Sequence, residues 1–199
     1  MTKLVMATNN ANKLREAREI LSPLGIEVLS LADIDIDCDP DENGETFEEN
    51  AGIKAEAVYN AIADKYGENM AVFADDSGLC VDALGGGPGV YSARYAPKGK
   101  ECEKLLDELM GIPDEKRTAR FVCSIVYLDK TGKSDAVHGI CEGMIDYEER
   151  GTNGFGYDPV FVVGNKTMAE MTSDEKNAVS HRGAAMKELY KLLEGKVNE

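Results

Sequence analysis

Residues 3–21 read KLVMATNNANKLREAREIL, and this stretch decides the class of fold. Its first part, 3–7, has the apolar composition of a buried strand. A polar turn at 8–10 follows and supplies residue types that favour helix N-termini. The last part, 11–21, places apolar side chains at helical spacing. A buried strand that passes through a polar turn into a helix predicts an α/β fold.

The rest of the chain continues this alternation of strands and helices. Apolar runs of strand length recur at 26–31, 70–74, 79–81, 118–128, 134–146 and 159–163. Helical spacing recurs at 47–66, 101–110 and 182–193. Because the turn 129–132 joins two of the strands into a late β ribbon, we expect a mixed sheet. The length of 199 residues fits one domain, or two small lobes around one sheet.

The composition excludes several classes of function. The formal net charge is −15, from 22 Lys and Arg against 37 Asp and Glu, which argues against nucleic-acid binding because that binding depends on cations that contact phosphate. No apolar run approaches the roughly 20 residues that span a bilayer, and no signal peptide precedes the first strand. Five widely spaced cysteines without a Cys-x-x-Cys pair indicate reduced packing residues. We therefore expect a cytoplasmic protein with no membrane partner.

Two polar segments at strand ends could bind phosphate and a metal ion. The first contains Thr8, Asn9, Asn10, Ala11, Asn12 and Lys13. Its amides open a helix and could hold phosphate, and Lys13 adds positive charge; an ordinary helix cap is the alternative. In the second segment, Asp75 and Asp76 follow an apolar strand. Paired carboxylates are costly without a cation, which indicates Mg²⁺, and one of them could activate water. An ordinary acidic turn is the alternative.

The acidic loop 39–44 admits more than one interpretation. Asp39, Asp41 and Asn43 match the first half of a calcium-binding EF-hand loop. The match fails at the last ligand position, where that loop needs glutamate and this chain has Asn50. A solvated acidic loop and a Mg²⁺ ligand from Asp41 remain the alternatives.

Two later segments could recognise a nucleobase. Residues 151–159 combine glycines, which permit close approach, with Phe155 and Tyr157, whose rings could stack on a base. A glycine-rich turn with core aromatics is the alternative. The residues Ser180-His181-Arg182 precede the last helix. A cation is unfavourable at a helix start, so an anionic or carbonyl-bearing ligand explains Arg182 better.

Six ordered motifs resemble the family of non-canonical purine nucleoside triphosphate pyrophosphatases, also called inosine triphosphate pyrophosphatases. They are ATNNANK (7–13), TFEENA (46–51) with Lys54, ADDSGL (74–79), ALGGGPGVYSARY (83–95), GFGYDP (154–159) and SHR (180–182). Together they cover nearly the whole chain. One departure occurs at Asn9, where the family frequently has glycine, and asparagine tolerates positive φ better than most residues.

The resemblance implies a reaction and a set of site residues. The reaction is Mg²⁺-dependent hydrolysis of ITP, dITP and XTP to the monophosphate and pyrophosphate. The resemblance implies that segment 8–13 and Lys54 bind the triphosphate and that Asp76 is the general base and a metal ligand. It implies a second metal ligand at Asp41, with Glu42 as the alternative. The remaining substrate-binding positions are Ser77, Phe155, Gly156, Tyr157, Asp158, Lys176, His181 and Arg182.

The resemblance also implies a single domain over 1–199, built as an elongated mixed sheet flanked by helices, with two lobes and an active-site cleft between them. It implies a homodimer. Donors aimed at a 6-oxo group would reject adenine, because its amino group would leave buried donors unpaired. Guanine would be rejected by a lack of room or of an acceptor for its 2-amino group. Two alternatives stay open: a pyrophosphatase for standard or pyrimidine triphosphates, and a calcium- or nucleotide-binding module.

Overall fold

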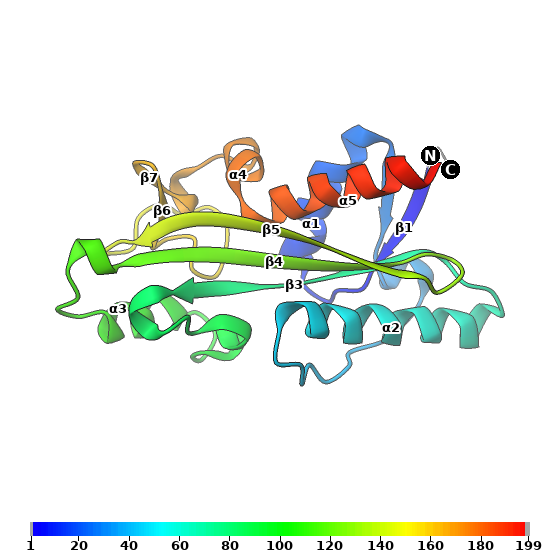
Figure 1. The fold of residues 1–199 in the computed structure, drawn as a ribbon, viewed down its shortest axis with the longest axis horizontal. Helices are drawn as coiled ribbons and strands as arrows, with labels where there is room; N and C mark the ends of the chain where they lie inside the picture. The colour runs from blue at the N-terminus through cyan, green and yellow to red at the C-terminus, as the bar shows by residue number, and fades with distance from the viewer. Residues whose placement is uncertain (1, 198–199) are drawn as a thin grey trace. The chain divides into compact units, whose positions relative to one another are not determined.

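Figure 1 shows the fold of the computed structural model, which describes residues 2–197. Within those residues one sheet has the strand order β2-β1-β3-β4-β5-β6-β7. The strands are β1 (Thr2–Met6), β2 (Ile26–Leu29), β3 (Val72–Val81), β4 (Thr118–Leu128), β5 (Ser134–Ile145), β6 (Phe161–Val163) and β7 (Lys166–Thr167). β1 pairs in parallel with β2 and β3, whereas β6 pairs antiparallel with β5 and β7. The predicted mixed α/β sheet is therefore confirmed.

The helices begin and end at the signals that local chemistry provides. They are α1 (Ala11–Leu21), α2 (Phe47–Tyr66), α3 (Glu101–Glu108), α4 (Ser173–Val179) and α5 (His181–Val197). At the start of α2, Thr46 Oγ1 accepts from Glu49 N, and the Glu49 carboxylate accepts from Thr46 N. This reciprocal capping box satisfies two amides that the helix leaves unbonded. The helix ends where Gly67 adopts a φ of 70°, which glycine tolerates without steric cost.

Several details of the predicted elements were wrong. The segments 70–74 and 79–81 form one strand, β3, because the chain stays extended through Asp75 and Asp76 instead of turning. The last helix runs from His181 to Val197 instead of 182–193, and the strand predicted at 159–163 begins at Phe161. Both α4 and β7 went unpredicted, because seven and two residues are too few to show a periodic pattern.

The chain forms two compact units, and the first, unit 1, comprises residues 2–76, 123–139 and 185–197. Alternate side chains of β1 enter two different cores in this unit. Leu4 and Met6 pack with side chains of α1 and α5. Val5 and Ala7 pack with side chains of α2. Because successive strand residues point to opposite faces, α2 covers one face of the sheet and α1 and α5 cover the other (Figure 1).

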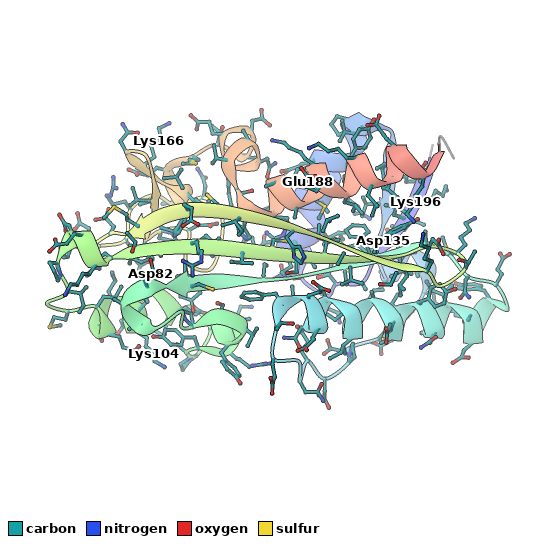
Figure 2. The ribbon with its side chains drawn as sticks, viewed as in Figure 1. Asp82, Lys104, Asp135, Lys166, Glu188 and Lys196 are labelled. Atoms are coloured by element: carbon teal, nitrogen blue, oxygen red, sulfur yellow. The ribbon has the colours of Figure 1, made fainter. Side chains whose placement is uncertain are left out.

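Helix α5 closes the first of these cores. Ala185, Met186, Leu189 and Leu193 are buried in it at helical spacing. Near the end of the helix, Lys196 Nζ lies 2.8 Å from Asp135 Oδ2, and Figure 2 shows the two residues side by side. None of the helices within residues 2–197 combines the length and the apolar character that crossing a membrane requires.

Unit 2 comprises residues 77–122 and 140–184 and has a core of its own. Arg117, a buried charged residue of this unit, donates to three carbonyl oxygens, those of Leu109, Ile145 and Asp146, at 2.6 to 2.8 Å. Buried polar groups are stable only when bonded in this way. Ile145 N also donates to Arg117 O. Arg117 therefore fastens the start of β4 to the end of β5.

Candidate active site

The polar turn between β1 and α1 is built as a helix cap. Asn10 Oδ1 accepts from Asn12 N at 3.0 Å and from Lys13 N at 3.2 Å. Thr8 Oγ1 accepts from Asn10 N. Asn9 Nδ2 donates to Cys38 O and to Asp39 Oδ1, both at 3.1 Å, so it ties the turn to the acidic loop. The cap interpretation is therefore confirmed, and phosphate binding by this segment stays a prediction.

Lys13 reaches from the first turn of α1 to the carboxylate of Asp75. Its Nζ lies 3.1 Å from Asp75 Oδ2 and 3.4 Å from Asp75 O. The Asp75 side chain has no exposed surface, and that of Lys13 is 14% exposed. Cys123 Sγ lies 3.9 Å from the same carboxylate oxygen. A desolvated pair of this kind holds Lys13 in one orientation.

Asp76, the next residue of β3, lies among polar side chains from α2. Asn50 Nδ2 donates to Asp76 Oδ2 at 3.3 Å, and Lys54 Nζ lies 3.4 Å from Asp76 Oδ1. Burial raises the pKa of Asp76; the positive charges of Lys54 and Lys13 oppose this rise, and the negative charges of Glu42 and Asp75 add to it. The buried carboxylate therefore holds a proton more tightly than an exposed aspartate does.

Glu42 is the acidic-loop residue that the structure brings to Asp76. Its Oε2 lies 2.7 Å from Lys54 Nζ, so Lys54 bridges the carboxylates of Glu42 and Asp76. Burial lowers the pKa of Lys54, but the attraction of Asp76, the hydrogen bond of Glu42 and the charge of Asp75 outweigh it, and the net pKa is raised. The lysine stays charged as a result. Asp41 is exposed, and its role as a metal ligand stays a prediction.

The contact between the acidic loop and α2 depends on Asn50 and Gly44. Gly44 N donates to Asn50 Oδ1 at 2.8 Å. A Cβ atom on Gly44 would lie 2.7 Å from the Cβ of Glu49, so only glycine fits this approach. Asn50 was not predicted as a site residue, although it belongs to the motif TFEENA. We refer below to Lys13, Glu42, Asn50, Lys54, Asp75 and Asp76 as the carboxylate cluster.

In unit 2, Asp158 organises a turn that presents Phe155. Its Oδ2 accepts from Phe155 N at 2.8 Å and from Lys176 Nζ at 2.6 Å. A Cβ atom on Gly154 would lie 2.0 Å from the same oxygen, and Gly154 has a φ of 76°. The turn therefore requires glycine at 154 and a side-chain oxygen acceptor at 158.

Two cations flank the half-buried ring of Phe155. Lys176 Nζ lies 4.8 Å and the Arg182 guanidinium carbon 5.8 Å from the ring centroid. Arg182 Nη2 also donates to Ser77 Oγ at 2.8 Å. We call Ser77, Phe155, Asp158, Lys176 and Arg182 the aromatic cluster. An aromatic face between cations can stack on a heterocycle while the cations contact its oxygens.

His181 and Tyr157 are both buried, in different surroundings. The imidazole of His181 stacks on Phe121 with ring centroids 4.6 Å apart and planes at 11°. Phe121 was not predicted as a site residue, because an apolar residue in a strand carries no functional signal. Tyr157 lies in the core of unit 2, and its hydroxyl donates to Ser92 O at 2.9 Å. Of the two aromatics predicted to stack on a base, Phe155 is thus the more exposed. Gly156, which lies between them, is exposed.

The two clusters have different chemical character. Carboxylates interleaved with lysines are typical of sites that bind phosphate together with a divalent cation, and a ring flanked by cations is typical of base recognition. Asp76 and Ser77, one from each cluster, are consecutive residues of β3. These features define an α/β protein that binds phosphorylated heterocyclic ligands.

Comparison with known proteins identifies the family. The chain belongs to the Ham1 family, whose model matches residues 4–192. It is 52% identical to the dITP/XTP pyrophosphatase of Bacillus subtilis (strain 168), over 98% of each chain. It is 46% identical to the enzyme of the same name from Clostridium perfringens (strain 13 / Type A), again over 98% of each.

Solved structures of the family have the same fold. The Ham1 protein of Staphylococcus aureus matches with a TM-score of 0.83 and 39% identity, over 98% of this chain and 100% of that one. The HAM1 protein of Coxiella burnetii matches with a TM-score of 0.84 at the same identity and coverage. The predicted family and fold are both confirmed.

Proposed function

We propose that this protein hydrolyses dITP, ITP and XTP to the nucleoside monophosphate and pyrophosphate, and so removes them from the nucleotide pool. Relatives named dITP/XTP pyrophosphatase are 52% and 46% identical to it over nearly their whole length. The observation that carries the assignment is the buried Asp76 carboxylate, held by Asn50 and Lys54. A buried carboxylate can accept a proton from a water molecule that attacks a phosphate, and neighbouring lysines can stabilise the negative charge of that phosphate.

In this proposal Asp76 accepts a proton from the attacking water. Burial raises its pKa, which makes the ionised form a stronger base than an exposed aspartate. Lys13 and Lys54 supply positive charge for the triphosphate. Asp75 orients Lys13 through their 3.1 Å contact, so the ammonium group need not reorganise when substrate binds.

The carboxylate cluster also suits Mg²⁺. Within residues 2–197 no three His, Cys, Asp or Glu side chains are arranged to hold a metal ion. Mg²⁺ is commonly held by only one or two carboxylates, together with water and substrate phosphates, and Asp76 and Glu42 meet this need. We propose these two as ligands, with Asp41 as the alternative to Glu42. When bound, Mg²⁺ would neutralise charge on the phosphate oxygens.

We assign recognition of the base to the aromatic cluster and His181. Phe155 would stack on the purine, and the donors of Lys176, His181 and Arg182 would face its 6-oxo group. An adenine amino group would leave these donors unpaired, which disfavours ATP. Gly156 and Tyr157 are proposed to contribute to base binding, and the segment 8–13 to phosphate binding.

We also propose that the protein is a homodimer. On β5, Ile140 and Met144 are 53% and 39% exposed on the same face as the exposed Glu142, whereas Cys141 and Ile145 are buried. Two large apolar side chains left in solvent on one strand favour burial against a second copy. Light scattering after size-exclusion chromatography would measure the mass, and a value near 21.6 kDa would mean a monomer.

We also propose that the protein is cytoplasmic. The five cysteines form no disulfide within the described residues, which suits a reducing compartment. The proposed substrates also occur in the cytoplasmic nucleotide pool.

The test is a substrate panel with product identification. The purified protein and Mg²⁺ are incubated with ITP, dITP, XTP, GTP, ATP and dTTP, and the released phosphate product is identified. We expect pyrophosphate from the first three and little from the others. Asp76→Asn, which preserves the shape of the side chain, should fold and lose at least about a thousandfold in turnover. Equal turnover of all six would reject the specificity, and orthophosphate as the product would reject the reaction.

A further inference from the structure

The motif ALGGGPGVYSARY (83–95) has no role in the proposed chemistry, yet it contains a buried hydrogen-bonding residue. Its last part forms a short 3-10 helix, η4 (Gly89–Arg94). Within it Ser92 is 7% exposed. Its Oγ accepts from Leu79 N at 2.9 Å and donates to Gly89 O at 2.6 Å. The hydroxyl thus joins η4 to β3, two residues beyond Ser77.

The carbonyl of the same residue holds the loop that carries Phe155. Tyr157 Oη donates to Ser92 O at 2.9 Å. Burial is the main cause that raises the pKa of Tyr157, so its hydroxyl remains a donor at physiological pH. A second contact from the core reaches this loop, since Cys102 Sγ lies 3.3 Å from Gly156 O. The loop is therefore held to the rest of unit 2 through Ser92 and Cys102.

The anchored residue lies inside the turn that presents the aromatic cluster. Phe155 N donates to Asp158 Oδ2, and Asp158 N donates to Phe155 O. Tyr157 lies between these two residues in sequence, so its hydrogen bond with Ser92 O restrains the same turn. A shift of this turn would move the Phe155 ring relative to Lys176, whose Nζ lies 4.8 Å from the ring centroid.

We propose that Ser92 and Tyr157 are positioning residues for the nucleobase. Their hydrogen bond sets the placement of Phe155 and Asp158, and through it the affinity for the base-bearing part of the substrate. This inference rests on the proposed function, because that function assigns the base to the aromatic cluster. It gives the motif 83–95 a role in binding and none in the chemical step.

Two tyrosine-to-phenylalanine variants test the proposal. Tyr157→Phe removes the bond to Ser92 O. Tyr95→Phe is the matched control. The ring of Tyr95 packs against the core of unit 2, with its centroid 6.5 Å from that of Tyr157. Its hydroxyl bonds to the Glu108 carboxylate instead of to the loop. Each change removes one hydroxyl, and only the first releases the loop.

The first readout is binding of IMP in metal-free buffer by calorimetry. We expect Tyr157→Phe to raise the dissociation constant by about tenfold, the effect of losing one hydrogen bond, and Tyr95→Phe to change it by less than about twofold. In turnover of ITP, KM should rise for Tyr157→Phe by more than kcat falls. Ser92→Ala, which frees η4 from β3, should shift KM in the same direction.

The second readout is hydrogen exchange of the amides in peptides that cover 151–160, measured without nucleotide. Faster exchange in Tyr157→Phe than in Tyr95→Phe would support the positioning role, even if the wild type proved inactive on ITP. Equal exchange and equal IMP affinity in the two variants would overturn it. A wild type that neither binds IMP nor hydrolyses ITP would refute the proposed function separately.

Discussion

The buried ion pair between Lys176 and Asp158 allows a quantitative prediction. Lys176 Nζ lies 2.6 Å from Asp158 Oδ2, and the two side chains are only 7% and 4% exposed. Asp158→Asn keeps an oxygen that can accept from Phe155 N, so the turn keeps its shape. It removes the negative charge and leaves the ammonium group buried beside a neutral amide. Removing one partner of such a pair costs about 3 to 5 kcal/mol.

We therefore expect Asp158→Asn to lose about 3 to 5 kcal/mol of unfolding free energy at pH 7. The loss comes from the buried positive charge, because the amide oxygen keeps the hydrogen bond with Phe155 N.

The reverse variant tests the same pair from its other side. Lys176→Met leaves the Asp158 carboxylate buried without the charge of the lysine, and it should also lose about 3 to 5 kcal/mol of unfolding free energy at pH 7.

Urea denaturation at pH 7 measures both variants by linear extrapolation. The matched control is Lys191→Met, whose exposed ion pair with Glu188 should contribute less than about 1 kcal/mol. Figure 2 labels Glu188 on α5. A loss below about 1 kcal/mol in Asp158→Asn or in Lys176→Met would refute the reasoning.

Four further changes test other parts of the structure, each by thermal or urea denaturation. Thr46→Ala removes half of the capping box of α2 and should cost about 1 kcal/mol, or about 2 to 4 °C in Tm for a chain of this size; an unchanged Tm would contradict the role of the cap. Gly183→Ala would place a Cβ atom 2.0 Å from Asn177 O, and this backbone clash should cost at least about 2 kcal/mol. The pKa of Asp76 is raised in the fold, so the wild type loses stability as pH rises from the pKa of an unfolded aspartate through the raised pKa of the folded state. In metal-free buffer the stability of Asp76→Asn relative to the wild type should therefore increase as pH rises through this range, and a relative stability that falls with rising pH would contradict this. Lys166→Ala breaks only an exposed ion pair on β7 (Figure 2) and should change stability by less than about 1 kcal/mol.

Elements with strong local signals were predictable from the sequence. Helix α1 begins and ends as predicted, because Asn10 caps its start and Pro23 and Gly25 follow its end. Strand β4 also has the predicted bounds, Thr118–Leu128. In both cases the deciding interactions join residues close together in the chain.

The course of β3 was not predictable in the same way. Asp75 and Asp76 are residues that usually favour turns, yet they stay extended and buried. Lys13 and Lys54 come from helices that are distant in sequence, and they offset the two carboxylates. The local sequence around Asp75 and Asp76 does not show that lysines from distant segments will lie beside their carboxylates.

The sequence by itself determined the family, the α/β class and most of the residues proposed to act, because motifs such as ADDSGL and GFGYDP keep their chemistry in short contiguous segments. Only the tertiary structure decided which of these residues touch. It brought Glu42 to Lys54, stacked Phe121 on His181 and fastened Tyr157 to Ser92. The physical reason is that each contact joins residues at least 12 positions apart, and such partners are selected by the packing of the sheet and helices that carry them.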